Sequence, residues 1–321
     1  MLRLCALHLA ATVLLVVANG CSEGAPAEES ATPPPRDERD RPIRVLDLDL
    51  DACDREPAGD PRLRVTAHEA AAGEYVASIE VALGKAIDHA GAVYRWTPRQ
   101  PLCVHLFASD EGFLQGLQQL AGWAPRLTYD YSNNGGTVGR DVATGQDAVY
   151  IKLTVRLVRE AENWAAYIAT HEYYHVVEWH IGGTNGGRQD HFPTWFLEGM
   201  ADWEATKQEG HPHPWWLTSL LAEERAGRAL LLGAFVTWDQ WRSFDIRRPL
   251  YWKARAALMY LEELAGPSAA YEILSLNAGG NLSRFETAFE EVSGLTLAEF
   301  EAGFLPFLER LAAAHPPVGL P

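Results

Sequence analysis

Two neighbouring segments determine how this chain is organised: Thr170-His171-Glu172-Tyr173-Tyr174-His175 and, after a Gly-rich interval, Trp195-Phe196-Leu197-Glu198-Gly199-Met200-Ala201-Asp202. The first segment has the pattern H-E-x-x-H. Residues four apart lie on one face of an α-helix, so His171 and His175 can bind one metal ion while Glu172 stands beside it. One helical turn therefore supplies two imidazole ligands and a candidate general base.

The second segment supplies the remaining candidates for a metal site. Hydrolytic zinc sites usually have three protein ligands and leave the fourth position open. We predict Glu198 as the third ligand, because it comes early in a second helix that the intervening loop can fold back onto the first. Asp202 lies four residues further on the same face, and we expect it to accept a hydrogen bond from a zinc-bound histidine. The predicted cofactor is Zn²⁺.

Together, the two segments resemble the motifs of the gluzincins, which include the thermolysins, the large zinc aminopeptidases and the peptidase-MA-like domains of bacterial envelopes. The resemblance covers residues 170–203. It implies an α+β fold, in which a thermolysin-like catalytic domain with a small mixed sheet and an HExxH helix is followed by an all-helical C-terminal part. It also implies hydrolysis of a peptide or protein substrate, with Glu198 as third zinc ligand and Glu172 as general base.

A later segment, Tyr251-Trp252-Lys253-Ala254-Arg255-Ala256, is similar to the Y-x-K-G-x-A segment of the zinc aminopeptidases. The tyrosine of that family segment stabilises the oxyanion, so Tyr251 is a candidate catalytic residue; the alternative is a tyrosine packed in the core. Position 254 is Ala where the family has Gly. The G-x-M-E-N motif of the aminopeptidases is absent here, which favours an endopeptidase over an exopeptidase.

The same residues fit two other functions. The first is a zinc-binding envelope lipoprotein that has no catalytic activity and acts as a binding or scaffold protein. The second is a zinc hydrolase of a non-peptide substrate, because open zinc sites serve several chemistries. Cleavage of a diverse peptide mixture distinguishes these alternatives from a peptidase.

The N-terminal region predicts export from the cell. Residues 1–20 contain an apolar run shorter than a membrane span and are predicted to be a signal peptide. The sequence Val17-Ala18-Asn19-Gly20-Cys21 resembles a bacterial lipobox, with Ala18 where leucine is usual. We therefore expect a protein of the bacterial envelope that meets the membrane only through a lipid on Cys21; the alternative is export without lipid. Residues 21–42, rich in Glu, Ala and Pro, are predicted to form a disordered tether.

The rest of the chain is predicted to form a catalytic domain over 43–212 and a helical part over 213–321 that completes the cleft. The formal net charge of −16 disfavours nucleic acid as a partner. Cys53 and Cys103 are the cysteines left after the signal and the lipid site, and in an oxidising compartment they suggest one disulfide. The alternative is two unpaired thiols. The oligomeric state is not indicated.

Apolar periodicity and turn residues predict the individual elements. Strands are expected over 43–50, 102–107 and 148–153, and helices over 73–90, 110–120 with Asp110 as cap, 154–181, 193–210, 214–223, 250–265, 268–276, 283–292 and 297–314. The strand over 148–153 either binds the substrate backbone by strand addition or is an ordinary edge strand. His180, His191, His211 and His213 are expected at the surface or in loops rather than in the site.

Overall fold

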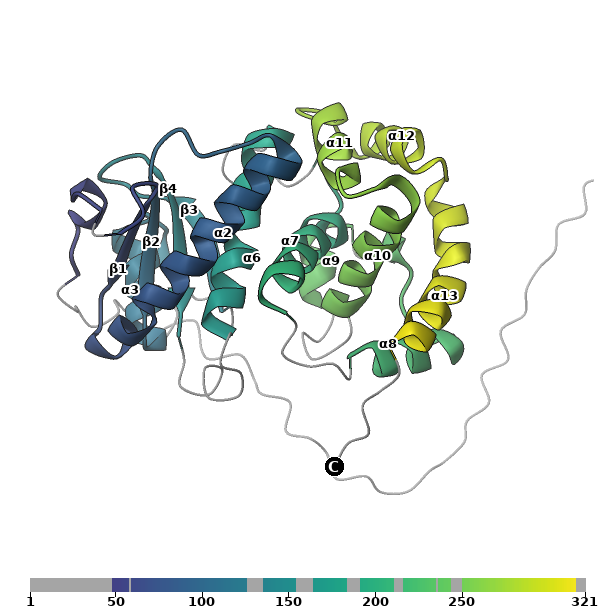
Figure 1. Ribbon diagram of the computed structural model, residues 1–321, viewed down its shortest axis with the longest axis horizontal. Coiled ribbons are helices and arrows are strands. Elements are labelled where there is room, and N and C mark those ends of the chain that lie inside the picture. Colours follow the sequence, from purple (N-terminus) through teal and green to yellow (C-terminus); the bar gives the residue numbers. More distant parts are fainter. Residues whose placement is uncertain are drawn as a thin grey trace, which may run out of the picture.

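A small sheet and a larger set of helices form the protein, as the computed structural model in Figure 1 shows. The structure describes residues 48–57, 59–125, 135–153, 164–183, 191–210, 216–234, 236–243 and 250–315. Its strands are β1 (Leu63–Ala67), β2 (Leu102–Phe107), β3 (Gly136–Arg140) and β4 (Asp147–Lys152). Its α-helices are α2 (Val76–Tyr94), α3 (Asp110–Gln119), α6 (Trp164–Gly182), α7 (Thr194–Glu209), α8 (Trp216–Arg225), α9 (Trp238–Ser243), α10 (Leu250–Ala265), α11 (Ala269–Leu276), α12 (Leu282–Ser293) and α13 (Leu297–Ala314). The predicted α+β class is confirmed, and the elements that the structure describes after β4 are all helices.

The sheet has the strand order β1-β2-β4-β3. β1, β2 and β4 are parallel, and β3 runs antiparallel to β4. In the centre, Val104 of β2 is aligned with Val65 of β1 and with Val149 of β4. All of β2 is buried, as expected for a central parallel strand covered on both faces.

Helices cover the two faces of the sheet. Leu102, Val104 and Leu106 of β2 join the main hydrophobic core, to which α2 and α6 contribute. The alternate residues Cys103 and Phe107 belong to a second, smaller core on the side of α3. The alternation follows from the pleat of a strand, in which successive side chains point to opposite faces.

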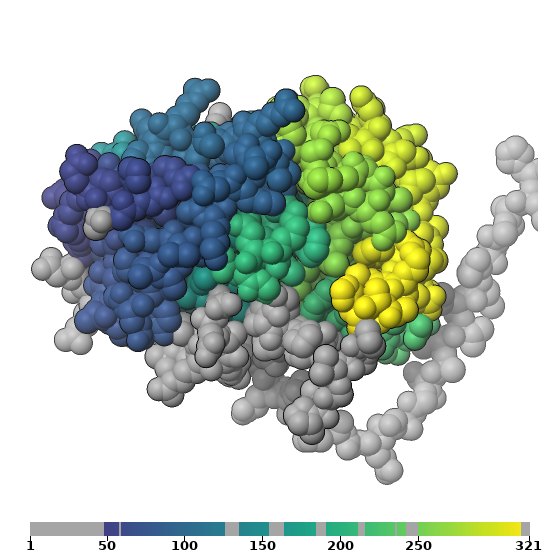
Figure 2. Space-filling view, in the orientation of Figure 1, coloured from purple at the N-terminus to yellow at the C-terminus, as the bar shows by residue number. Residues whose placement is uncertain are grey.

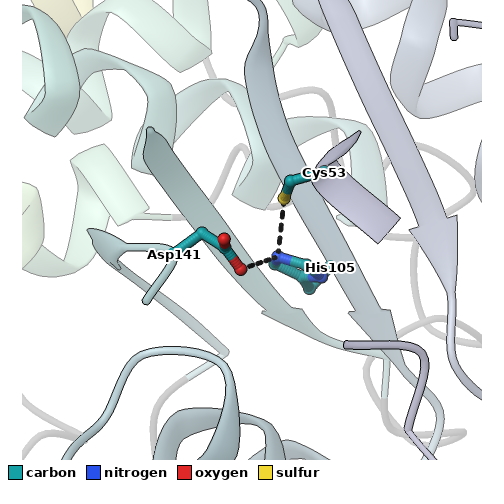
Figure 3. A group of neighbouring side chains, drawn as sticks. All are labelled: Cys53, His105 and Asp141. Carbon is teal, nitrogen blue, oxygen red and sulfur yellow. Dashed lines mark hydrogen bonds and ion pairs between the residues drawn. The ribbon is translucent and has the colours of Figure 1, made fainter. Parts of the chain in front are cut away.

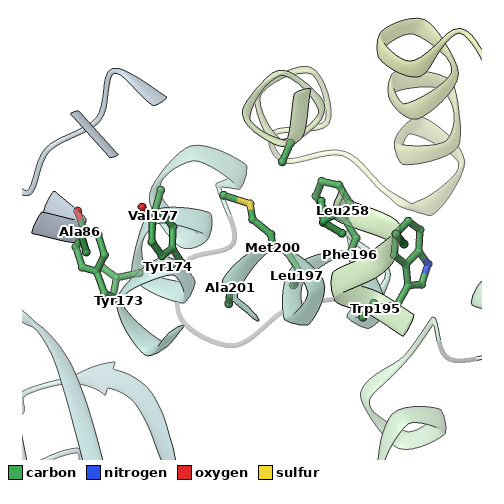
Figure 4. Packing of buried hydrophobic residues seen from close by; sticks show 14 of the residues in the cluster. Ala86, Tyr173, Tyr174, Val177, Trp195, Phe196, Leu197, Met200, Ala201 and Leu258 are labelled. Atoms are coloured by element: carbon green, nitrogen blue, oxygen red, sulfur yellow. The ribbon is translucent and has the colours of Figure 1, made fainter. Parts of the chain in front are cut away.

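The main core continues from the sheet into the helical half of the protein. α7 packs between α6 and α10, and Figure 4 shows Tyr174 and Val177 of α6, Met200 and Ala201 of α7, and Leu258 of α10 in this layer. The space-filling view shows the N-terminal part and the C-terminal helices meeting across this face (Figure 2). The sheet and the C-terminal helices thus share one hydrophobic core.

Gly199 determines how closely α7 approaches α10. A Cβ atom at this position would lie 2.5 Å from the backbone carbonyl oxygen of Ala254. This is too short for any real contact, so the glycine of the second motif is required by packing. The small side chain of Ala254, where the resembling family has glycine, is compatible with this close approach.

Most of the predicted helices are confirmed. α10, α12 and α13 lie within one residue of their predicted bounds, and α6 ends as expected at Gly182, before Gly183 with its positive φ of 69°. The cap of α3 is Ser109, whose hydroxyl accepts from the Gly112 amide, so the prediction of Asp110 as the cap was wrong. Ser109 has the extended backbone typical of an N-cap, whereas Asp110 is already helical.

Both interpretations of residues 148–153 were wrong. The predicted strand exists as β4, but it is hydrogen-bonded on one side to β2 and on the other to β3. It therefore has no free edge for strand addition. The edge next to it is β3, a short strand with the sequence Gly-Thr-Val-Gly-Arg, which was not among the predicted strands.

The prediction of a disulfide between Cys53 and Cys103 is confirmed, with Cα atoms 5.7 Å apart. The predicted signal peptide over 1–20, the tether over 21–42 and Cys21 lie outside the described residues, as does most of the strand predicted over 43–50. Among the residues that are described, no helix has both the length and the apolar character needed to cross a bilayer.

Candidate metal centre

α6 and α7 bring the predicted ligands together. His171 and His175 project from one face of α6, and Glu198 projects from the second turn of α7. α6 is held against the sheet and against α7 by the main core, which fixes the relative position of the two helices. Both His175 and Glu198 are buried, while the His171 side chain keeps 12% of its surface exposed.

The distances between the three side chains match a metal site. The Nε2 atoms of His171 and His175 are 3.2 Å apart. Glu198 places Oε2 at 3.5 Å from Nε2 of His171 and Oε1 at 3.7 Å from Nε2 of His175. Ligand atoms bound at 2.0–2.1 Å to a tetrahedral ion lie about 3.3 Å apart. The donors are therefore spaced to hold a metal ion together.

The site also has the negative charge that stabilises a bound cation. Burial lowers the pKa of His175, but the carboxylates of Glu178, Glu198 and Glu172 outweigh burial and raise this pKa to about 10. The pKa of His171 is likewise raised, because Glu198 outweighs burial and the neighbouring His175. Surroundings that stabilise a positive charge on these rings also stabilise a metal ion between them.

Glu172 lies beside the three ligands, at the start of strand β3. A Cβ atom on Gly136 would lie 2.7 Å from Cγ of Glu172, so the absence of a side chain at Gly136 makes room for Glu172. Burial raises the pKa of the Glu172 carboxyl, and the nearby His171 and His175 oppose that rise. The ligands and the candidate base are thus gathered at the edge of the sheet.

Glu178 was missed in the sequence analysis. Its Oε2 lies 2.8 Å from Nδ1 of His175, and the carboxylate is almost completely buried. A carboxylate on the outer nitrogen of a metal-binding histidine fixes the tautomer and the orientation of the ring. The signal was present in the sequence, because residues three apart are neighbours on a helix.

Asp202 is close to His171 but makes its hydrogen bonds elsewhere. Its Oδ1 lies 4.0 Å from Nδ1 of His171, which is too long for a hydrogen bond. The same Oδ1 accepts from the Tyr167 hydroxyl, and Oδ2 accepts from Nε of Arg255 at 2.6 Å. Arg255 in turn lies over the ring of Trp216, 5.0 Å from its centre. Asp202 is placed behind His171 by a buried network that the sequence did not reveal.

Tyr251 lies at the site, as its candidate role requires. The ring centres of Tyr251 and His171 are 6.3 Å apart, and Trp241 packs edge-on against Tyr251 at 4.9 Å. Burial, followed by the negative charge of Glu198, raises the pKa of the Tyr251 phenol well above its usual value. The phenol is therefore protonated at neutral pH and available as a hydrogen-bond donor.

Of the other histidines near the motif in sequence, two are described. His180 forms an ion pair with Asp147 at 2.6 Å and stacks on Trp96, away from the ligand group. His191 accepts a hydrogen bond at its backbone oxygen from Asn277. The predictions for His211 and His213 lie outside the described residues.

Comparison with known proteins adds no family to this geometry. No protein-family model matches the chain, and no curated protein shows significant similarity to it.

Proposed function

We propose that the protein is a zinc-dependent metallopeptidase of the bacterial envelope, acting as an endopeptidase and held at the membrane by a lipid on Cys21. The observation that carries the proposal is the convergence of His171, His175 and Glu198 within 4.8 Å of one another, with Glu172 next to them. Two imidazoles and one carboxylate form a ligand set typical of catalytic zinc sites that cleave peptides.

His171, His175 and Glu198 would hold the zinc ion, which would supply a Lewis acid that polarises a substrate carbonyl and makes water a stronger acid. Glu172 accepts the proton of the water as it attacks the carbonyl carbon. The same carboxyl then donates that proton to the nitrogen of the leaving amine. Its buried position suits the second step, because a carboxylic acid shielded from water holds the proton until the amine takes it.

Attack on the carbonyl creates a negative charge on oxygen, which requires a donor. Tyr251 provides a protonated phenol on the His171 side of the ligand group. The edge-on contact with Trp241 limits the orientations of its ring. In the proposed mechanism, the Tyr251 hydroxyl donates a hydrogen bond to this oxygen.

Strand β3 is suited to hold the substrate backbone. It pairs with β4 on one side and, among the described residues, with no strand on the other. Its first residue, Gly136, touches Glu172. An extended peptide added to this edge would be hydrogen-bonded along its backbone and would pass the candidate base. This mode of binding requires no free terminus, which supports an endopeptidase.

The proposal is tested by mass-spectrometric profiling of a mixed peptide library with the zinc-loaded protein and with its Glu172→Ala variant. We expect internal cuts that fall by about 10²–10⁴-fold in the variant, because the general base is lost while the three zinc ligands remain. Equal cutting by both samples would contradict the mechanism. The absence of cuts by a zinc-loaded wild type would favour a binding protein or a hydrolase of a non-peptide substrate.

A further inference from the structure

A second group of metal-binding residue types lies on the opposite face of the sheet. Cys53 belongs to the 3-10 helix Ala52–Asp54, His105 to β2, and Asp141 follows β3. The Cys53 Sγ atom is 3.5 Å from Nε2 of His105, and Oδ2 of Asp141 is 3.9 Å from the same nitrogen. Figure 3 shows the three side chains pointing toward one another. The three potential ligand atoms all lie within 4.8 Å of one another.

Neighbouring residues hold this group in place. Nδ1 of His105 is hydrogen-bonded to Nε2 of His68 at 2.9 Å, and the His105 ring stacks on Tyr150 with centres 5.0 Å apart. The amide and the hydroxyl of Thr144 each donate to Oδ1 of Asp141 at 2.8 Å. These contacts leave Nε2 of His105 and Oδ2 of Asp141 facing the Cys53 sulfur. Similar supporting bonds orient the ligands of metal sites.

The group is buried, and its hydrogen-bonding capacity is not fully used. Cys53, His105 and Asp141 are each at most 2% exposed. Within the described part of the chain, Oδ2 of Asp141 receives no hydrogen bond. A buried carboxylate oxygen without a donor is costly, and such an atom calls for an explanation. A cation bound between Oδ2 and Nε2 would remove that cost.

The disulfide controls whether the third ligand exists. Cys53 is bonded to Cys103, and a sulfur in a disulfide is not the thiolate that binds a metal. We propose that reduction of the Cys53–Cys103 disulfide opens a second metal site, in which the Cys53 thiolate, Nε2 of His105 and Oδ2 of Asp141 bind Zn²⁺.

A dithiol supplies the electrons that reduce the Cys53–Cys103 disulfide. The disulfide bond takes two electrons and two protons from the dithiol, which leaves as a disulfide. The Cys53 thiol loses its proton when the metal binds. Reoxidation by exchange with a second disulfide, which takes the two electrons and leaves as a dithiol, restores the Cys53–Cys103 bond and releases the metal. Zinc is the expected ion because it accepts sulfur, imidazole nitrogen and carboxylate oxygen together in a tetrahedral site. The oxidised and the metal-bound forms of this face are therefore mutually exclusive.

The Cys103→Ser and Cys53→Ser variants form a matched pair for testing this site. Both lose the same disulfide, but only Cys103→Ser keeps the three-residue ligand group. Zinc per chain is measured under anaerobic conditions by inductively coupled plasma mass spectrometry, with circular dichroism to confirm folding. Cys5 and Cys21 are unchanged in both variants, so any zinc that they bind contributes equally to the two measurements. We expect Cys103→Ser to bind one zinc ion per chain more than Cys53→Ser.

Cobalt adds a direct test of the sulfur ligand. Substitution of cobalt for zinc should give a thiolate-to-cobalt charge-transfer absorption in Cys103→Ser and none in Cys53→Ser. Equal zinc content and equal absorption in the two variants would overturn the proposal. If either variant does not fold, the same readouts on wild-type protein reduced with a phosphine decide the question. In that experiment, the reduced wild type should bind one more zinc ion than the oxidised protein, and reduced Asp141→Asn should not. No additional zinc in the reduced wild type would refute the site.

Discussion

Arg255 and Asp202 form an ion pair that joins α10 to α7 directly behind the candidate metal centre. Nε of Arg255 donates to Oδ2 of Asp202 at 2.6 Å, and both side chains are almost completely buried. The other oxygen of Asp202 faces His171 at 4.0 Å. The pair therefore fixes a carboxylate behind His171, a ligand of the proposed zinc ion.

Replacing Arg255 by Met should be strongly destabilising. The substitution leaves the Asp202 carboxylate buried without its cation, which costs about 3–5 kcal/mol of unfolding free energy. Arg225, whose ion pair with Glu309 is mostly exposed, is the matched control, and Arg225→Met should cost less than about 1 kcal/mol. Urea unfolding of both variants measures the difference. Equal losses would show that the buried pair has no special role.

Glu178 should affect zinc affinity through His175. Because its carboxylate accepts from the outer nitrogen of that ring, Glu178→Ala is expected to weaken zinc binding by about 10–100-fold. Glu178→Gln keeps an acceptor oxygen and should lose less. Competition with a chromophoric chelator gives the affinities. The assignment fails if the alanine variant binds zinc as tightly as the wild type.

A methyl group at Gly136 should disturb the general base while leaving the zinc ligands in place. In Gly136→Ala the new Cβ would overlap Cγ of Glu172, so we expect zinc to be retained and peptide cleavage to fall at least about tenfold. Gly73→Ala is the control, because no atom lies within 4 Å of a Cβ at that position. Zinc content and cleavage rate are measured on both. Full activity of Gly136→Ala would argue against Glu172 as the base.

Glu204 should make stability depend on pH at the acid end. Burial alone would raise its pKa, but His89, Lys207 and Tyr94 outweigh burial and lower it below 4.5. A carboxyl with a lowered pKa in the folded state stabilises the protein above its unfolded pKa. That contribution is lost as the pH falls through the folded pKa.

Denaturant unfolding of wild-type protein and Glu204→Gln between pH 3 and pH 7 checks this prediction. The wild type should be more stable by about 1–3 kcal/mol near neutral pH, and the difference should shrink as Glu204 is protonated. A difference that stays constant across this range would contradict the assignment.

The features that follow from spacing along one helix could be predicted from the sequence. His171, Glu172 and His175 lie on one turn, so the period of the helix places them together whatever the tertiary structure. Glu178 obeys the same rule and could have been found at its three-residue offset from His175. Glu198 needed one further step, the expectation that the intervening loop folds a second helix back onto the first.

Features set by tertiary contacts could not be predicted in this way. The partners of Asp202 come from α6 and α10, 35 and 53 residues away, and no local pattern identifies Tyr167 or Arg255 as those partners. Strand β3 was missed because the sequence Asn133-Asn134-Gly135-Gly136, which overlaps its first residue, favours a turn. The contact with Glu172 explains the glycine at 136, and the ring of Tyr150, 3.3 Å from a Cβ built at Gly139, explains the glycine at 139.

Zinc content of the oxidised protein tests the central claim most directly. The account predicts about one zinc ion per chain in the wild type, measured by inductively coupled plasma mass spectrometry, and loss of most of it in Glu198→Ala, because one of three ligands is removed. A folded wild type that binds no zinc, or a Glu198→Ala variant with full occupancy, would contradict the ligand set of His171, His175 and Glu198.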